Sequence, residues 1–283
     1  MKVSIKMTKA KTPKIAKTVK AKGKFSNRIC NLLPSRDVGK DWTFQDSLSS
    51  GALTAPAAPP KSVDLRATWW AINNQGGTGS CVGWAAADGV MRYHLTQANR
   101  LAKNQMLSPR FVWMASKETD EFTTKPQTFI EEAGTSLKSA MDIVRKYGTA
   151  LDSELPFDIS TNMFIGTESA FYASASTRKA ANYFNLGKNI SQWKSWLANN
   201  GPILAGLSVD ATWENAADNA GKLDTFLPNT ARGGHAICIV GYTPDRFIIR
   251  NSWGTTWGDK GFGYASHSYI KDAFFPESYG VTL

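Results

Sequence analysis

The local pattern of the chain changes at Asn200-Gly201-Pro202, and this change limits the folds open to it. Before that point, helical periodicity or runs of small residues occur in three places, at residues 81–99, 137–147 and 190–199. After it come short apolar runs typical of strands, at residues 203–209, 235–242 and 247–251. Thr243-Pro244-Asp245 joins the last two runs and predicts a hairpin turn. Helices followed by strands, with no repeating βαβ pattern, predict an α+β fold.

The positive charge of the chain is concentrated at its beginning. Residues 1–24 contain nine lysines and no acidic residue, whereas the remaining 259 residues carry 24 basic and 23 acidic side chains. The lysines interrupt any apolar core of the length that a secretory signal needs, about 7–15 residues. Low hydrophobicity with charge of one sign predicts a basic disordered tail over residues 1–24.

The composition places the rest of the chain among ordinary globular proteins. Hydrophobic residues make up 42% and charged residues 20% of the sequence. No apolar run approaches the roughly 18 residues of a membrane span. The three cysteines, Cys30, Cys81 and Cys238, cannot form a disulfide framework and do not have the spacing of a metal site. We therefore expect no metal and no organic cofactor.

Three residues far apart in the sequence have the types that nucleophilic catalysis needs. A glycine-rich turn over residues 75–80 delivers Cys81 to the start of a helix, where unpaired N–H groups and the helix dipole favour a thiolate and predict a lowered pKa. His235 opens a strand, and Asn251 lies sixteen residues later, at the end of the return strand. A hairpin of this kind can place the amide beside the imidazole. This is the arrangement of nucleophile, base and orienting group; a lone cysteine would instead be read as a core residue.

Nine short motifs in a fixed order resemble those of papain-like cysteine peptidases, over about residues 60–283. They are Val63-Asp64-Leu65-Arg66, the turn from Gln75 to Cys81, Leu107-Ser108-Pro109, Lys146-Tyr147-Gly148, Leu155-Pro156-Phe157, Gly201-Pro202, His235-Ala236, Val240-Gly241-Tyr242 and Asn251-Ser252-Trp253-Gly254. The resemblance implies hydrolysis of peptide bonds in peptide or protein substrates. It assigns Cys81 as nucleophile, His235 as general base and then acid, Asn251 as the group that orients the imidazole, and Gln75 with the Cys81 N–H as the oxyanion hole.

The resemblance also implies the residues that contact substrate. Trp253 would shield the contact between Asn251 and His235 from water, and Trp257 would line the leaving-group side. The second specificity pocket would draw on Thr135, Ser136, Leu137, Gly206 and Gly234. Because the two glycines are small, we expect a roomy apolar pocket.

The implied architecture has two lobes with the active site in the cleft between them. A helical lobe would cover about residues 76–200, and a β-barrel-like lobe about residues 201–283 together with 61–75; the peptidase domain as a whole would be residues 61–283. Residues 25–60 would form a pro-like N-terminal arm that ends in the Pro/Ala linker Ala52–Pro60. We expect this arm to lie against the domain and to limit access to the cleft; the alternative is packing without regulation.

Several positions depart from the family pattern. Thr78 and Glu132 stand where the family usually has a disulfide pair, and Val82 stands where a Trp usually follows the nucleophile. A version without this disulfide resembles bacterial members of the xylellain kind. Together with the missing signal peptide it favours a cytoplasmic location, with unconventional export as the alternative. We also expect a monomer.

Two other functions use features of the same sequence. An acyltransferase or amidase could use the same catalytic residues with a different attacking group. A non-catalytic protein on a peptidase fold could bind polyanions weakly through residues 1–24. Of the remaining candidates, His94 is interpreted as a packed helical residue and Cys238 as a small core residue.

The location of the charge makes a prediction about polyanions. The full chain should bind heparin with an affinity that falls steeply with added salt, because lysines release condensed counterions. A chain without residues 1–24 should not bind, since the rest of the molecule is nearly neutral. Salt-resistant binding, or binding that survives the deletion, would place the site on the domain instead.

Overall fold

The structure is a computed structural model that describes residues 25–119, 133–157 and 168–283. The helices are α1 (Phe44–Ser49), α2 (Cys81–Gly83), the π-type segment η2 (Trp84–Met91), α3 (Arg92–Gln97), α4 (Pro109–Thr119), α5 (Leu137–Lys146), α6 (Glu168–Ala175), α7 (Ile190–Asn199) and α8 (His267–Ala273). The strands are β1 (Val63–Asp64), β2 (Asn182–Asn185), β3 (Ile203–Val209), β4 (Lys222–Leu223), β5 (Gly233–Tyr242), β6 (Arg246–Arg250), β7 (Phe262–Ser266) and β8 (Phe274–Thr282). Short 3₁₀ turns are η1 (Val38–Lys40), η3 (Ala211–Trp213) and η4 (Pro228–Thr230).

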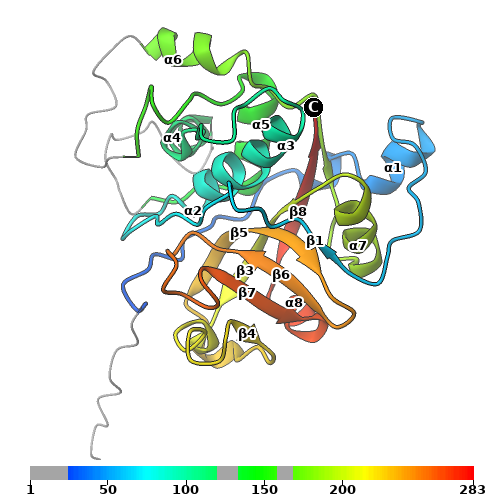
Figure 1. Ribbon diagram of the computed structural model, residues 1–283, viewed down its shortest axis with the longest axis vertical. Helices are drawn as coiled ribbons and strands as arrows, with labels where there is room; N and C mark the ends of the chain where they lie inside the picture. Colours follow the sequence, from blue (N-terminus) through cyan, green and yellow to red (C-terminus); the bar gives the residue numbers. More distant parts are fainter. Residues whose placement is uncertain (1–24, 120–132, 158–167) are drawn as a thin grey trace, which may run out of the picture.

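The helices and the strands form two lobes (Figure 1). Helices α2 to α6 lie together above the sheet, whose strands run in the order β2-β8-β3-β5-β6-β7-β4, with β1 paired to β5. All pairings are antiparallel except that of β4 with β7. Within the described residues this order does not close into a barrel. The α+β fold with two lobes that the sequence predicted is confirmed.

Both faces of the sheet are covered, which explains why its central strands are almost entirely apolar. On β5, Ala236, Cys238 and Val240 face the core shared with the helical lobe, whereas Ile237 and Ile239 face a second core. Side chains alternate between faces along a strand, so burial of both faces requires a continuous apolar run. Cys238 is thus the small core residue that the sequence predicted.

The second core shows which helix supports the sheet from the other side. Trp193 and Trp196 of α7 and Phe184 of β2 are buried there with residues of β3 and β5. The sheet lobe therefore includes β2 and α7, which come before the expected boundary near residue 200. Helix α7 spans the predicted residues 190–199, and α5 ends at Lys146, before Gly148 with its φ of 95°.

The helix that begins at Cys81 packs directly on β5. Gly89 makes this close approach possible, because a Cβ built on it would lie 3.0 Å from the Cβ of Cys238. Every residue from Cys81 to Arg92 is buried, as its small side chains predicted. His235 lies near the start of β5, three residues before Cys238. The contact between Gly89 and Cys238 therefore sets the position of Cys81 relative to His235.

A buried ion-pair network joins the same helix to β6. Asp88 accepts hydrogen bonds from Arg92 at 2.8 Å and from Arg250 at 2.7 Å, and its side chain is fully buried. The Arg250 guanidinium also lies 4.8 Å from the ring centroid of Trp70. Burial by itself would raise the pKa of Asp88, but the charges of Arg250 and Arg92 outweigh it and hold that pKa below its usual range.

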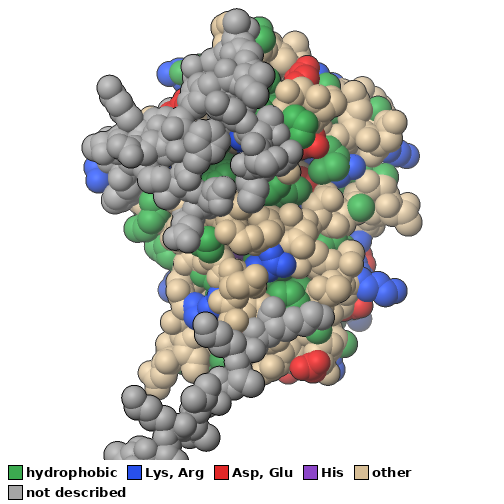
Figure 2. Space-filling model, turned by 90° about the vertical axis from the view of Figure 1, so that its left-hand side faces the viewer, with side chains coloured by type: hydrophobic (Ala, Val, Ile, Leu, Met, Phe, Trp, Pro, Cys, Tyr) green, Lys and Arg blue, Asp and Glu red, His purple; other side chains and the backbone are tan. Residues whose placement is uncertain are grey.

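The remaining surface is mixed in charge. Basic and acidic side chains are dispersed among neutral ones on the face shown in Figure 2. None of the helices in the described ranges is both long and apolar enough to cross a membrane.

The ion-pair network predicts a large effect on stability. Asp88→Ala should lower the free energy of unfolding by about 3–5 kcal/mol, because it leaves two buried arginines without their carboxylate. The matched control is Asp64→Ala, which breaks the partly exposed pair with Arg66 and should cost about 1 kcal/mol or less. Chemical denaturation measures both, and equal losses in the two variants would contradict the prediction.

The lowered pKa of Asp88 adds a prediction about pH. A carboxylate whose pKa is lower in the folded state stabilises the protein above its unfolded-state pKa of about 4. This contribution is lost as the pH falls through the folded-state value. Wild-type stability should therefore drop on acidification below about pH 4, and the drop should be smaller in Asp88→Ala.

Candidate active site

The oxyanion turn and the loop after β6 hold each other in place. Gln75 is fully buried, and its backbone N–H donates to the Ser252 carbonyl at 2.8 Å. Its side-chain oxygen accepts from the Ser252 hydroxyl at 2.7 Å, and its Nε2 donates to the Thr78 carbonyl at 2.8 Å. Both ends of the amide are therefore oriented, with one N–H of Nε2 left available.

Thr78 is buried and its hydroxyl forms a hydrogen bond with the Ser80 hydroxyl at 2.6 Å, so a polar contact occupies the usual disulfide position. Glu132, the other half of that position, lies outside the described residues.

The imidazole of His235 has a defined tautomer. Its Nε2 lies 2.8 Å from Oδ1 of Asn251, and the same oxygen accepts from the Ser252 N–H at 2.8 Å. Because an amide oxygen can only accept, Nε2 must carry the proton. Nδ1 then carries a lone pair that can accept a proton. This atom is buried and has no hydrogen-bond partner among the described residues. This is the state of a histidine that can accept a proton from a thiol.

An aromatic shell surrounds the contact between His235 and Asn251. Trp253 lies 4.9 Å from the His235 ring and Trp213 lies 5.6 Å from it, edge-on. Trp257 is fully buried behind them and donates to the Trp213 carbonyl at 3.0 Å. Trp257 thus supports the shell, and its assignment to the leaving-group side stays a prediction. Trp213 was missed from the sequence, since nothing in its local pattern places it near His235.

Burial disfavours the charged forms of both the Cys81 thiol and the His235 imidazole in this arrangement. Burial raises the pKa of Cys81 to about 12, and the nearby N–H groups of Ala236 and Val82 only partly oppose it. Burial likewise lowers the pKa of His235 to about 4, and the hydrogen bond that His235 donates to Asn251, which raises this pKa, only partly opposes it. The prediction of a lowered pKa for Cys81 is therefore wrong for this state. The loss of contact with water raises this pKa by more than the N–H groups at the helix start lower it.

The arm, residues 25–60, runs between the helices and the sheet (Figure 1) and forms hydrogen bonds with both lobes. The Leu32 N–H donates to the Gly234 carbonyl at 3.0 Å, and the Leu33 N–H donates to the Thr135 carbonyl at 3.1 Å. Arg232, three residues before His235, donates to the carbonyl groups of the arm at Ser26 (3.0 Å) and Arg28 (2.7 Å). The arm then forms α1, where Phe44 packs edge-on against Trp196.

Leu32 fills the apolar pocket predicted beside His235. A Cβ built on Gly206 would lie 2.6 Å from Leu32 Cδ2 and 2.8 Å from the Cβ of Phe275, and Gly234 faces the same two side chains. The two glycines thus leave the space that Leu32 uses, and Phe275 closes it. Phe275 could not be found from the sequence because it enters from β8, about 40 residues beyond the nearest pocket residue.

The other pocket residues have different positions. The Thr135 carbonyl pairs with the arm, and the Ser136 hydroxyl caps α5 by accepting from the Ser139 N–H. Leu137 is fully buried and belongs to the same core cluster as Leu32, and its assignment to the pocket stays a prediction.

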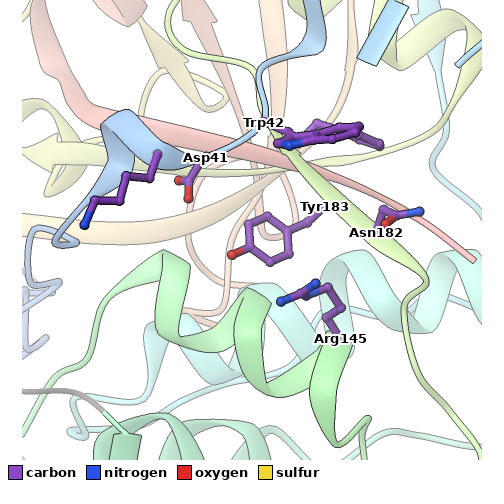
Figure 3. A pocket seen from close by; sticks show the side chains of 7 residues that line it. Asp41, Trp42, Arg145, Asn182 and Tyr183 are labelled. Atoms are coloured by element: carbon purple, nitrogen blue, oxygen red, sulfur yellow. The ribbon is translucent and has the colours of Figure 1, made fainter. Parts of the chain in front are cut away.

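A second cavity, of about 330 Å³, lies where the arm docks beyond the cleft (Figure 3). It is lined by Lys40, Asp41, Trp42, Arg145, Asn182, Tyr183 and Phe184. Tyr183 donates to Asp142 at 2.7 Å, and its ring lies 5.6 Å from the Arg145 guanidinium. None of its lining residues belongs to the catalytic group, so this cavity is separate from the candidate active site.

Comparisons with known proteins agree with this geometry. A sequence profile described as papain family cysteine protease matches residues 59–272. The chain therefore belongs to the papain family of cysteine proteases, as its motifs predicted.

Individual relatives are distant. Cysteine proteinase 1 of Dictyostelium discoideum is 25% identical over 205 residues, which cover 68% of this chain and 56% of that protein. An uncharacterized peptidase C1-like protein of Acanthamoeba polyphaga mimivirus is 24% identical, over 70% of this chain and 65% of its own length. The chain thus spans less than two thirds of the length of these two relatives. The crystal structure of xylellain, a cysteine protease from Xylella fastidiosa, is similar with a TM-score of 0.73 at 22% identity, over 94% of this chain and 99% of that one.

Proposed function

We propose that this protein hydrolyses peptide bonds through an acyl-enzyme on Cys81. The observation that carries the proposal is the bond from His235 Nε2–H to Asn251, because it leaves Nδ1 as the base. Membership of the papain family supports the same conclusion. The substrates are peptides or proteins.

The proposed reaction uses the described groups in sequence. His235 Nδ1 takes the thiol proton as Cys81 Sγ attacks the peptide carbonyl carbon. The negative oxygen accepts hydrogen bonds from the free N–H of Gln75 and the backbone N–H of Cys81. The C–N bond then breaks, and the imidazolium gives its proton to the leaving amine. Water, deprotonated by the same imidazole, hydrolyses the thioester and restores the thiol.

We propose further that the arm keeps the enzyme latent. With the arm in place, Cys81 and His235 are both fully buried, so neither the thiolate nor the imidazolium is favoured. Leu32 occupies the pocket that would receive a substrate side chain. Displacement of the arm would return water to the pair and lower the barrier to proton transfer.

The direction of the arm supports this proposal. An acylated substrate has its N-terminal part on the acyl side, where Leu32 and Gly234 lie. The arm places its earlier residues, such as Phe25, on Trp253 at 6.0 Å, the leaving-group side. The arm therefore runs opposite to a substrate and can occupy the cleft without presenting its peptide bonds for attack.

We also propose a monomer that works in the cytoplasm. All three cysteines are free thiols, which suits a reducing compartment. The lysine-rich residues 1–24, with their proposed weak polyanion contact, lie outside the described residues.

The catalytic roles predict the effect of single substitutions. Cys81→Ala should abolish turnover of fluorogenic peptides and covalent labelling by thiol-directed peptide inhibitors. His235→Ala should cost nearly as much, because the residues act as a unit. Gln75→Ala should reduce kcat by about 10²–10³. Full activity in Cys81→Ala would disprove the assignment.

The latent state predicts activation when the arm is loosened. Leu32→Glu should raise kcat/KM for small peptides, because a carboxylate is unfavourable in the apolar pocket and weakens the hold of the arm. Gln45→Glu, an exposed change on α1 of the same arm, is the matched control and should leave the rate unchanged. Deletion of residues 1–59 should raise the rate as well. An unchanged rate in folded Leu32→Glu argues that the arm only packs.

A further inference from the structure

The guanidinium of Arg28 lies in a group of oxygen atoms that the domain provides. Its Nη1 donates to the Gly76 carbonyl at 2.5 Å and to Oδ1 of Asn74 at 2.8 Å. Its Nη2 lies 3.5 Å from the Trp253 carbonyl. Three acceptors from two segments thus converge on one half-buried cation. Hydrogen bonds from a charged donor are stronger than neutral ones, so this arrangement selects for positive charge.

These oxygens are held in place without the arm. Asn74 and Trp253 pair as an antiparallel bridge, and the Gly254 N–H donates to the Asn73 carbonyl at 3.1 Å. The Gly76 N–H donates to Asn74 Oδ1 at 3.0 Å and so turns that oxygen toward the site. The same bridge region orients the oxyanion turn. The acceptor group is therefore a feature of the catalytic domain, and it would remain assembled when Arg28 leaves.

The site lies on the leaving-group side of the catalytic centre. Gly76 directly follows the oxyanion residue Gln75, and Trp253 covers His235. Leu32 marks the opposite, acyl side of the cleft at Gly234. Arg28 is also close enough to His235 that its charge contributes to lowering the histidine pKa. A group in this site therefore belongs to the first residues after the bond that is cleaved.

The other nearby cation does not oppose a positive guest. Arg232 lies on the same side but forms an ion pair with Glu214, and it donates to backbone carbonyls of the arm. The charge of Arg232 is thus balanced by a carboxylate. The acceptors around Arg28 are neutral oxygens, and a cation in the site would donate hydrogen bonds to them.

We propose that the oxygens of Asn74, Gly76 and Trp253 form a leaving-group subsite for a guanidinium, and that Arg28 is its internal occupant. The enzyme then prefers substrates with arginine at the first or second position after the scissile bond. This inference rests on the proposed peptidase function and names the substrate class of that same site.

The test uses internally quenched peptides that differ only at those two positions. Each position carries arginine, its neutral isostere citrulline, or norleucine in turn. The enzyme is the full chain with Arg28→Ala, which empties the subsite, and Arg36→Ala, an exposed arginine of the same arm, is the matched control. At one of the two positions we expect kcat/KM in Arg28→Ala to fall from arginine to citrulline to norleucine, by about tenfold or more overall.

Wild type and Arg36→Ala should show the same order of kcat/KM among the three peptides, with lower values, because the substrate must displace Arg28. The comparison of peptides in these two proteins remains valid if Arg28→Ala folds poorly. Asn74→Asp should widen the gap between arginine and citrulline, since it adds a negative charge beside the guest. Equal kcat/KM values for the three residues at both positions would overturn the subsite.

The outcomes separate this inference from the function on which it rests. Cleavage of all peptides without preference overturns the subsite alone. No cleavage of any peptide and no labelling of Cys81 by a thiol-directed peptide probe, also in a full chain whose arm is released by Leu32→Glu, overturns the peptidase function itself.

Discussion

The ion pair between Asp88 and Arg250 connects the two halves of the catalytic group. Asp88 lies seven residues after Cys81 on the buried helix. Arg250 is the last residue of β6 and immediately precedes Asn251. A fully buried carboxylate needs its partners within hydrogen-bond distance, so the helix cannot slide along the sheet without a large cost. Together with the contact of Gly89 on Cys238, it sets the position of the nucleophile against the histidine and its orienting amide.

Burial has two opposite consequences in this molecule. It strengthens the Asp88 network, because charges attract more strongly away from water. At Cys81 and His235 the same loss of water favours the neutral thiol and the neutral imidazole. We propose that the enzyme, which needs a charged pair, is therefore at rest while the arm covers its cleft. In our proposal the arm controls activity through solvent access rather than through any change in the catalytic residues.

In our proposal, the arm imitates parts of a substrate in reverse order. Leu32 uses the apolar pocket on the acyl side, and Arg28 uses the oxygen-lined site on the leaving-group side. Between them, backbone hydrogen bonds tie the arm to Thr135 and Gly234. If this proposal holds, the side chains of the arm indicate which substrate residues the cleft binds.

The sequence by itself determined the elements and the chemistry of the centre. The helical periods of α5 and α7, the apolar runs of β3 and β5, and the order Cys81, His235, Asn251 were all readable, because local patterns encode local structure. The course of the arm, the closure of the pocket by Phe275, the shielding by Trp213 and the raised pKa of Cys81 were decided only by the tertiary structure. Each of these depends on contacts between segments distant in the chain, or on the exclusion of water by all of them together, and neither leaves a local signal in the sequence.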